Sequence, residues 1–351
     1  MIQQLKGLNT LRALAALIVV WGHVEYLKQK AGIPNLIDSD FSFFPDGHIA
    51  VILFFVLSGF LITYLLSNEL NSSNTINFRR FYRNRILRIW PLFYFILIVS
   101  YLLFQPDLTV QTHLLCFTIF PNLADAWNIE WIVSPQVWSI GVEEQFYLVW
   151  PFVFYLLPKK KVLLFLSFFI VFYALLPHLL GYLNVRIWNS QSITSFTGNF
   201  FHNSKFSCIA IGAFFGFLYV NHKEKIRIFF SNYISFSLLF LTLTLWFLRV
   251  EIPFFTDELF ALLFGISLLG IVENKQLKIE TRWTHFLGEI SYGIYLFHWI
   301  VILIVMKYLP VFNDKIHYNL ALYFFVFSGT ILLSWISNRT LERFFLKMKQ
   351  N

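Results

Sequence analysis

Residues 11–23 read LRALAALIVVWGH, an apolar run that holds an arginine near its start and ends on a histidine. With its flanks the run reaches about residue 27, and a helix needs about 20 apolar residues to cross a bilayer. An ionisable side chain inside lipid costs on the order of a few kcal/mol unless protein groups surround it. Arg12 and His23 therefore indicate that this helix belongs to a bundle with a polar interior.

Arg12 and His23 share one face of the predicted helix. Eleven residues make three turns plus about 20°, with a rise of roughly 16 Å. The shared face favours an inward, functional stripe. The alternative is that Arg12 extends to the inner interface and His23 lies in the outer one.

The composition is that of an integral, polytopic membrane protein. Of the 351 residues, 58% are hydrophobic and only 13% are charged, whereas about a quarter of a soluble domain is charged. The net charge of +8 suits basic cytoplasmic loops beside anionic lipid better than nucleic acid. Cys116 and Cys208 have no metal-like spacing, so we expect packing residues and no metal site.

Apolar runs separated by polar breaks predict an all-α bundle of about ten transmembrane helices. The expected spans are 8–27, 48–67, 86–104, 138–157, 162–180, 205–221, 227–248, 254–272, 286–308 and 317–337. The run LLCFTIF at 114–120 is too short to span and ends before Pro121, so it is expected to be interfacial or re-entrant. We expect one membrane domain over 1–351, with no fused soluble domain.

The distribution of Lys and Arg sets the expected orientation. Cytoplasmic loops carry an excess of these residues. With ten spans and both termini in the cytoplasm, 19 of the 27 Lys and Arg residues lie inside. An eleventh span at 111–124 would reverse every later loop and put most of that charge outside.

The segment VWSIGVEEQFYLVWP, residues 137–151, opens the fourth span with a polar stripe. Ser139, Glu143 and Tyr147 follow one another at intervals of four and share a helix face. Glu143 is expected at a depth comparable to that of His23, and a buried carboxylate needs a partner. We predict that Glu143 pairs with His23, which would suit a general base for a hydroxyl. The alternative is that Glu143 or Glu144 faces outside water.

Two further spans carry polar side chains. FRRFYRNRILRIWPLFY, residues 78–94, brings Arg85 and Arg88 into the third span. Arginine forks suit phosphate groups, so a nucleotide-bearing donor is one interpretation and topology alone is the other. LGEISYGIYLFHW, residues 287–299, places three polar residues on one face, and we expect them to line a cavity: Ser291, Tyr295 and His298. FFVLSGFLIT at 54–63 is assigned to helix packing through its small residues Ser58 and Gly59.

These stretches together resemble the acyltransferase-3 family of membrane proteins, which includes sugar O-acyltransferases of bacterial envelopes. The matching pieces are Arg12 with His23, FFVLSGFLIT, RILRIWP, VWSIGVEEQFY and SYGIYLFH, and they occur in the family's order. The chain departs from the usual pattern at Ala50, where a glycine is common, and in LERFF, which lacks the usual proline. Both departures lie outside the expected chemistry.

The resemblance implies transfer of an acyl group from cytoplasmic acyl-CoA to a hydroxyl of a cell-envelope or extracellular polysaccharide. It implies a bacterial cytoplasmic-membrane protein with acetyl-CoA as co-substrate and no permanently bound cofactor. Arg12, His23 and Glu143 are then expected in catalysis. Substrate contacts are expected from six residues: Arg85, Arg88, Trp138, Ser139, Tyr295 and His298. The residues leave open direct transfer or a covalent acyl-histidine.

The alternative from another class is a multi-span transporter or flippase of a lipid-linked or anionic substrate. Such proteins often contain internal repeats, and no repeat is evident in this sequence. The acceptor glycan, the hydroxyl position and the oligomeric state are left open.

Overall fold

The computed structural model describes residues 5–38, 45–274, 276–310 and 315–348, and all regular secondary structure in these ranges is helical. Each of the ten predicted spans overlaps one long helix. These helices are α1 (Leu8–Lys30), α2 (Gly47–Ser73), α3 (Phe78–Phe104), α6 (Val137–Leu156), α7 (Lys159–Leu183), α9 (Phe206–Asn221), α10 (Asn232–Phe247), α11 (Thr256–Glu273), α13 (Ser291–Tyr308) and α14 (Lys315–Ser337).

Shorter helical segments connect them. They are α4 (Val110–Cys116), α5 (Pro121–Ala126), η1 (Asn184–Trp188), α8 (Gln191–Asn203), η2 (Lys223–Phe230), α12 (Arg282–Glu289), η3 (Asn338–Glu342) and α15 (Arg343–Lys347). The run at 114–120 falls on α4 and the turn after it, and with seven residues α4 is too short to span. Two predicted spans are broken in the structure. The range 286–308 divides between α12 and α13, and 227–248 bends by 76° between η2 and α10.

Seven described helical stretches are long and apolar enough to cross a membrane, or up to eight if the bent pair counts as one span. They include α1, α2, α3, α7, α13, the continuous stretch from α8 to α9, and α14 with its C-terminal extension. Helices α6 and α11 are not among them. The architecture is consistent with an integral membrane protein, whereas the count of ten and the cytoplasmic termini stay predictions.

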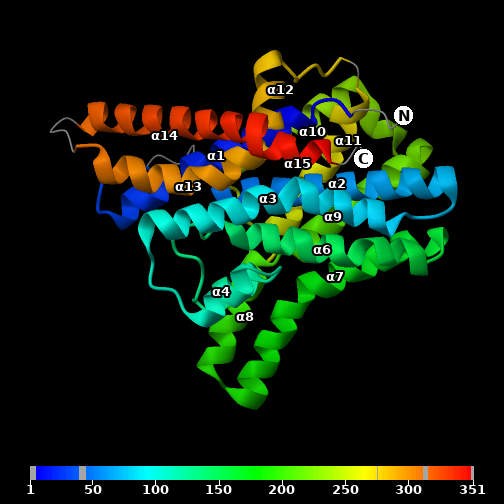
Figure 1. The fold of residues 1–351 in the computed structure, drawn as a ribbon. Helices are drawn as coiled ribbons and strands as arrows, with labels where there is room; N and C mark the ends of the chain where they lie inside the picture. The colour runs from blue at the N-terminus through cyan, green and yellow to red at the C-terminus, as the bar shows by residue number, and fades with distance from the viewer. Residues whose placement is uncertain (1–4, 39–44, 275, 311–314, 349–351) are drawn as a thin grey trace.

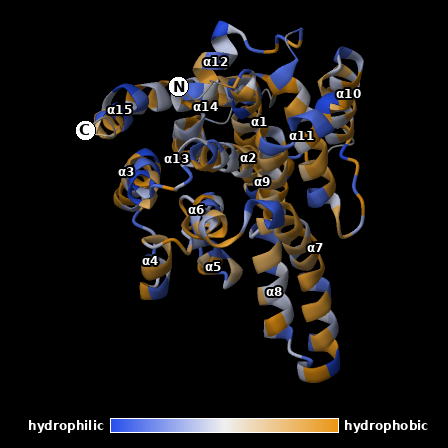
Figure 2. Cartoon of the chain, turned by 90° about the vertical axis from the view of Figure 1, so that its right-hand side faces the viewer, coloured by the Kyte–Doolittle hydropathy of each residue, from blue (hydrophilic) through white to orange (hydrophobic). Residues whose placement is uncertain are grey.

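The long helices of the bundle lie side by side along one direction. Figure 1 shows α1, α2, α3, α6, α13 and α14 running lengthwise, with α7 and α8 diverging as a hairpin. Figure 2 looks almost down that direction, and hydrophobic residues cover much of the outer surface of α7 and α8. Leu164, Phe168 and Phe172 of α7 are exposed. Exposed apolar side chains on a long helix are expected where lipid surrounds it.

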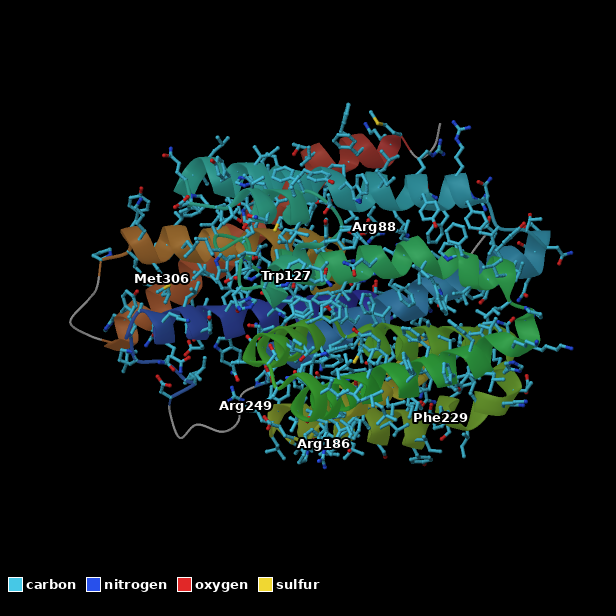
Figure 3. All side chains as sticks on the ribbon, turned by 90° about the horizontal axis from the view of Figure 1, so that it is seen from below. Arg88, Trp127, Arg186, Phe229, Arg249 and Met306 are labelled. Atoms are coloured by element: carbon cyan, nitrogen blue, oxygen red, sulfur yellow. The ribbon has the colours of Figure 1, made fainter. Side chains whose placement is uncertain are left out.

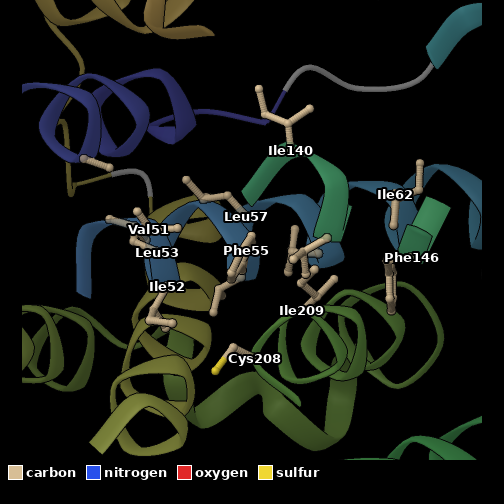
Figure 4. Close-up of a cluster of buried hydrophobic side chains, with 14 of the residues drawn as sticks. Val51, Ile52, Leu53, Phe55, Leu57, Ile62, Ile140, Phe146, Cys208 and Ile209 are labelled. Atoms are coloured by element: carbon tan, nitrogen blue, oxygen red, sulfur yellow. The ribbon is translucent and has the colours of Figure 1, made fainter. Parts of the chain in front are cut away.

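Close packing of α2 against α9 forms the centre of the bundle. A Cβ atom on Gly59 would lie 1.9 Å from the carbonyl oxygen of Ile209, and one on Gly212 would lie 2.2 Å from that of Val56. Only glycine allows the two backbones to approach so closely. The predicted packing role of Gly59 is therefore confirmed. Figure 4 shows the buried side chains at this interface, including Cys208, which is fully buried like Cys116.

The start of α1 is held by the segment that leads into α12. The backbone N–H of Gly7 donates to Oε2 of Glu280 at 2.6 Å, and the hydroxyls of Thr10 and Thr284 lie 2.9 Å apart. His285 Nδ1 lies 2.5 Å from Oε1 of Glu280. That hydrogen bond raises the pKa of His285. Burial opposes ionisation of Glu280, but the hydrogen bonds from His285 and Gly7 outweigh it and lower the pKa of this carboxyl.

Candidate active site

A cavity of about 390 Å³ lies between α1, α2, α3, α6 and α13. Its polar lining includes the three arginines that the sequence singled out, Arg12, Arg85 and Arg88, together with Glu143. Three cations against one carboxylate give this lining a positive charge. In Figure 3, Met306 of α13 and Phe229 of η2 lie toward opposite ends of the bundle, and Arg88 of α3 lies between them. The interpretation of Arg85 and Arg88 as topology signals alone is incomplete, because both side chains line the cavity.

The three arginines converge from two helices. Arg12 enters from the first turns of α1, and electrostatic interactions reach it from Arg85, Arg88 and Glu143. None of these arginines forms an ion pair within 4 Å of a described acidic group. Guanidinium groups without carboxylate partners are suited to an incoming anion.

The predicted stripe on α6 forms one wall of the cavity. Ser139, Glu143 and Tyr147 all line it. The hydroxyl of Tyr147 donates to Oε2 of Glu143 at 3.2 Å and also contacts the hydroxyl of Ser58. Arg85 lies over the Tyr147 ring, 5.4 Å from its centre. Ser58 therefore also belongs to the cavity wall, and its assignment to helix packing alone was incomplete.

Glu144, the neighbour of Glu143, faces a different helix. Its Oε2 accepts a hydrogen bond from Nε1 of Trp90 on α3 at 2.7 Å. The side chain is half-buried. The alternative that Glu144 simply faces outside water is not what the structure shows.

His23 is paired with another histidine. Its Nδ1 lies 2.7 Å from Nε2 of His298 on α13, and the two rings are nearly parallel, with an interplanar angle of 5°. Trp299 packs edge-on against His23 with ring centres 5.0 Å apart. His298 is fully buried. The pair lies outside the lining of the large cavity.

The predicted pairing of His23 with Glu143 is absent from the described hydrogen bonds and ion pairs. Helix α1 packs chiefly against α2, α12 and α13, so the neighbour of His23 comes from α13. Glu143 instead meets Tyr147 and the arginine cluster. Similar depths for His23 and Glu143 could be predicted from helix spacing, but the order in which helices pack could not, and the neighbouring helix decides the partner.

Tyr295 lies between the cavity and the histidine pair. Its hydroxyl lies 2.6 Å from the hydroxyl of Ser139 and donates to the carbonyl of Gln136 at 3.1 Å. Its ring centre is 5.8 Å from that of His298. Ser291 and Tyr295 line the cavity as predicted. His298, one turn further along the same face, contacts His23 instead.

Trp138 is outside the cavity lining, although it was predicted to contact substrate. Its ring packs edge-on against Phe55 of α2, with centres 6.0 Å apart. The structure therefore places the Trp138 ring against α2, outside the cavity. Its predicted contact with substrate stays untested.

A second polar cluster was missed by the sequence reasoning. His48 stacks on His202 with ring centres 4.7 Å apart, and Asp257 accepts from His48 at 3.2 Å and from Lys205 at 2.7 Å. A smaller cavity of about 260 Å³ is lined in part by His48, His202 and Asp257. These residues come from three separate parts of the chain, at 48, at 202–205 and at 257, so no local pattern could have grouped them all.

Comparison with known proteins gives the family. The model of the acyltransferase domain, Acyl_transf_3, matches residues 5–339. The chain belongs to the acyltransferase-3 family. Residues that carried the resemblance thus lie in a matched region that covers nearly the whole chain, and the family is one of acyltransferase enzymes.

Individual acyltransferase-3 relatives are more distant. The chain is 28% identical over 159 residues to the peptidoglycan O-acetyltransferase OatA of Listeria monocytogenes, which covers 41% of this chain and 23% of that protein. It is 28% identical over 162 residues to the O-acetyltransferase OatA of Staphylococcus aureus, covering 42% of this chain and 24% of that protein. The chain thus matches about a quarter of the length of these relatives. No solved structure matches it.

Proposed function

We propose that this acyltransferase-3 protein is a membrane O-acetyltransferase, which moves an acetyl group from acetyl-CoA to a hydroxyl of a bacterial cell-envelope polysaccharide. The observation that carries the proposal is the continuity of three features. An arginine-lined cavity meets Tyr295, and Tyr295 meets the His23–His298 pair. The names of the bacterial relatives support acetyl as the acyl group and peptidoglycan as the first acceptor to test.

The cavity suits the donor end of the reaction. Phosphates of acetyl-CoA would bind Arg85 and Arg88, which line the cavity and form no ion pair within 4 Å in the part of the chain that the structure describes. A long pantetheine arm separates these phosphates from the thioester. Arg12 and His23 are roughly 16 Å apart along α1, so the arm would lead from the arginines past Tyr295 toward His23.

The histidine pair suits a general base. Nδ1 of His298 faces the backbone carbonyls of Ile294 and Tyr295, without a full hydrogen bond. A carbonyl only accepts, so we assign the proton of His298 to Nδ1, and its Nε2 then accepts from Nδ1–H of His23. That tautomer leaves a lone pair on Nε2 of His23, where a base for a sugar hydroxyl is needed.

In direct transfer, Nε2 of His23 removes the proton from the acceptor hydroxyl as its oxygen attacks the thioester carbonyl. The carbon–sulfur bond then breaks, the oxygen keeps the acetyl group as an ester, and the proton passes from His23 to the leaving CoA thiolate. In the covalent route, Nε2 itself attacks the thioester and CoA leaves as the thiolate; the acceptor hydroxyl then attacks the acetyl group on His23, the nitrogen–acetyl bond breaks, and the hydroxyl proton passes to the CoA thiolate. Both routes need the same tautomer.

The test uses full-length protein in lipid nanodiscs with radiolabelled acetyl-CoA and soluble peptidoglycan fragments. We expect label on the glycan with wild-type protein and none with His23→Gln. The matched control is His113→Gln, because His113 on α4 is half-buried and its described contacts are with Thr109 at the start of that helix and with the rings of Tyr101 and Trp131. Wild-type transfer by His23→Gln would overturn the mechanism. Movement of a lipid-linked glycan across vesicles without acetyl-CoA would instead favour the flippase.

A further inference from the structure

A groove of about 380 Å³ lies at the C-terminal end of α14, apart from the arginine cavity. It runs between α12 on one side and the segment α14–η3–α15 on the other. Two arginines line it, Arg339 and Arg343, with Asn338 and Trp335 beside them. Its remaining walls are mostly apolar and come from Phe286, Ile290 and Leu346.

The two arginines are available for a ligand. Both are exposed, and neither has a hydrogen bond or ion pair with any residue in the described ranges. One carboxylate is also in the lining, that of Glu289, which lies 3.2 Å from Nε2 of His285, so two guanidinium groups face a single carboxylate. Two unpaired guanidinium groups therefore give the groove a net positive charge, and guanidinium forks match phosphate oxygens.

The surface that leads into the groove is apolar and exposed. On the preceding turn of α14, the exposed fractions are 54% for Leu332, 39% for Leu333 and 43% for Ile336. Trp335, with 41% exposed, lies at the boundary where this surface meets the arginines. Apolar residues followed by Trp and then Arg along one helix mark the level where lipid tails give way to headgroups.

We propose that this groove binds the phosphate headgroup of an anionic phospholipid, whose acyl chains lie along the exposed face of α14. A soluble phosphate would use the arginines but leave the apolar walls uncovered. A lipid uses both. Basic grooves at the membrane surface of a helical bundle are suited to this chemistry.

The groove is connected to the arginine cavity through one helical turn. Glu342 lies between Arg339 and Arg343 in sequence but is buried, where it accepts from the hydroxyl of Ser337 at 3.2 Å and interacts electrostatically with Arg88. Lipid bound to the outer side of η3 would therefore stabilise the turn whose inner side faces Arg88. The proposal does not depend on the acetyltransferase reaction.

Retention of lipid can be measured directly by native mass spectrometry. Full-length protein in detergent would be mixed with dioleoylphosphatidylglycerol or with dioleoylphosphatidylcholine as the zwitterionic probe. We expect retained phosphatidylglycerol with wild-type protein, and at least tenfold weaker retention with Arg339→Gln/Arg343→Gln, because two charge-assisted contacts are lost. The matched control is Lys160→Gln/Lys161→Gln, two exposed cations at the start of α7, for which we expect a change of less than about twofold.

The same measurement can overturn the proposal. Equal retention of phosphatidylglycerol by the arginine variant and wild type would do so, as would equal binding of both lipids. Displacement of the lipid by inorganic phosphate or by acetyl-CoA would assign the arginines to a soluble ligand. Thermal unfolding of each variant in phosphatidylcholine nanodiscs checks folding. If the double variant unfolds early, the single variants Arg339→Gln and Arg343→Gln replace it, each with several-fold weaker retention expected.

Discussion

The arginine cavity and the histidine pair are neighbours in one bundle, but they differ in charge and in how closely they are packed. The cavity holds several charged groups in a space large enough for a ligand, and its arginines form no ion pair within 4 Å among the described residues. The histidine pair is closely packed by aromatic rings, and its hydrogen-bond capacity is used mainly within the pair. In the proposed reaction, the charged cavity would bind the donor and the oriented imidazole of His23 would take the proton.

The largest effect is expected at His23. Replacement by Ala or Gln removes the proposed base, and base catalysis contributes roughly 10²–10⁴-fold to a rate. We expect kcat for glycan acetylation to fall by that amount while binding of acetyl-CoA stays within about twofold, because the arginines are unchanged. Steady-state kinetics and equilibrium binding of acetyl-CoA in nanodiscs measure the two quantities. A large loss of acetyl-CoA binding in His23→Ala would show that the two regions form one binding site.

Variants of the cavity arginines are expected to weaken acetyl-CoA binding more than they lower kcat. Arg85→Gln and Arg88→Gln each remove a charge-assisted contact worth about 1.5–3 kcal/mol. We expect the KM for acetyl-CoA to rise by about tenfold or more in each, with a smaller change in kcat. Acetyl-dephospho-CoA, which lacks one phosphate, should lose less affinity in the variant whose arginine binds that phosphate. Unchanged KM values in both variants would show that the cavity does not bind the donor.

His298 distinguishes orientation from packing. Gln at this position keeps a side-chain oxygen that can accept from Nδ1–H of His23, whereas Leu only fills space. We expect His298→Leu to lower kcat on the order of tenfold, as part of the 10²–10⁴-fold contribution of the base. His298→Gln should recover most of that loss. Equal activity of the two variants would show that His298 only packs against His23.

The smallest effect is expected where α12 holds the start of α1. The pKa of His285 is raised by Glu280, so this pair stabilises the fold at low pH and the contribution fades as pH rises through the raised pKa. In acid the contribution is lost again, because the carboxylate of Glu280 is protonated as the pH falls through its lowered pKa. Because the pair is partly exposed, we expect less than about 1 kcal/mol. Thermal unfolding should show a lower Tm for His285→Gln at pH 6 and nearly none of that difference at pH 9.

Most of the helices could be predicted from the sequence, because each is an apolar run with polar ends. The breaks inside two of the runs could not. Residues 286–308 read as one largely apolar run, yet α12 ends and α13 begins there, and Gly288 packs directly on the backbone of Asn9. Such a break comes from a tertiary contact with a segment about 280 residues away, which no local pattern records.

The same distinction between local patterns and tertiary contacts applies to the candidate site. Helical spacing correctly placed Ser139, Glu143 and Tyr147 on one wall, because residues four apart on a helix share a face. Spacing could not identify the partner of His23, which depends on the helix beside it. The role of Ser58 was missed because a small residue on an apolar helix can serve packing or a cavity equally well.

The hydrogen bond between Tyr295 and Ser139 has a consequence for the membrane itself. A bacterial membrane stores energy as an ion gradient, and any open passage through a bundle would discharge it. If the acetyl group passes Tyr295 on its way to His23, the opening needs to admit only an uncharged group a few atoms wide. A hydrated ion would have to break the Tyr295–Ser139 contact. It would then lose its hydration shell beside Trp299 and His298. In the proposed reaction, the acetyl group would therefore cross the bundle without an open passage for ions.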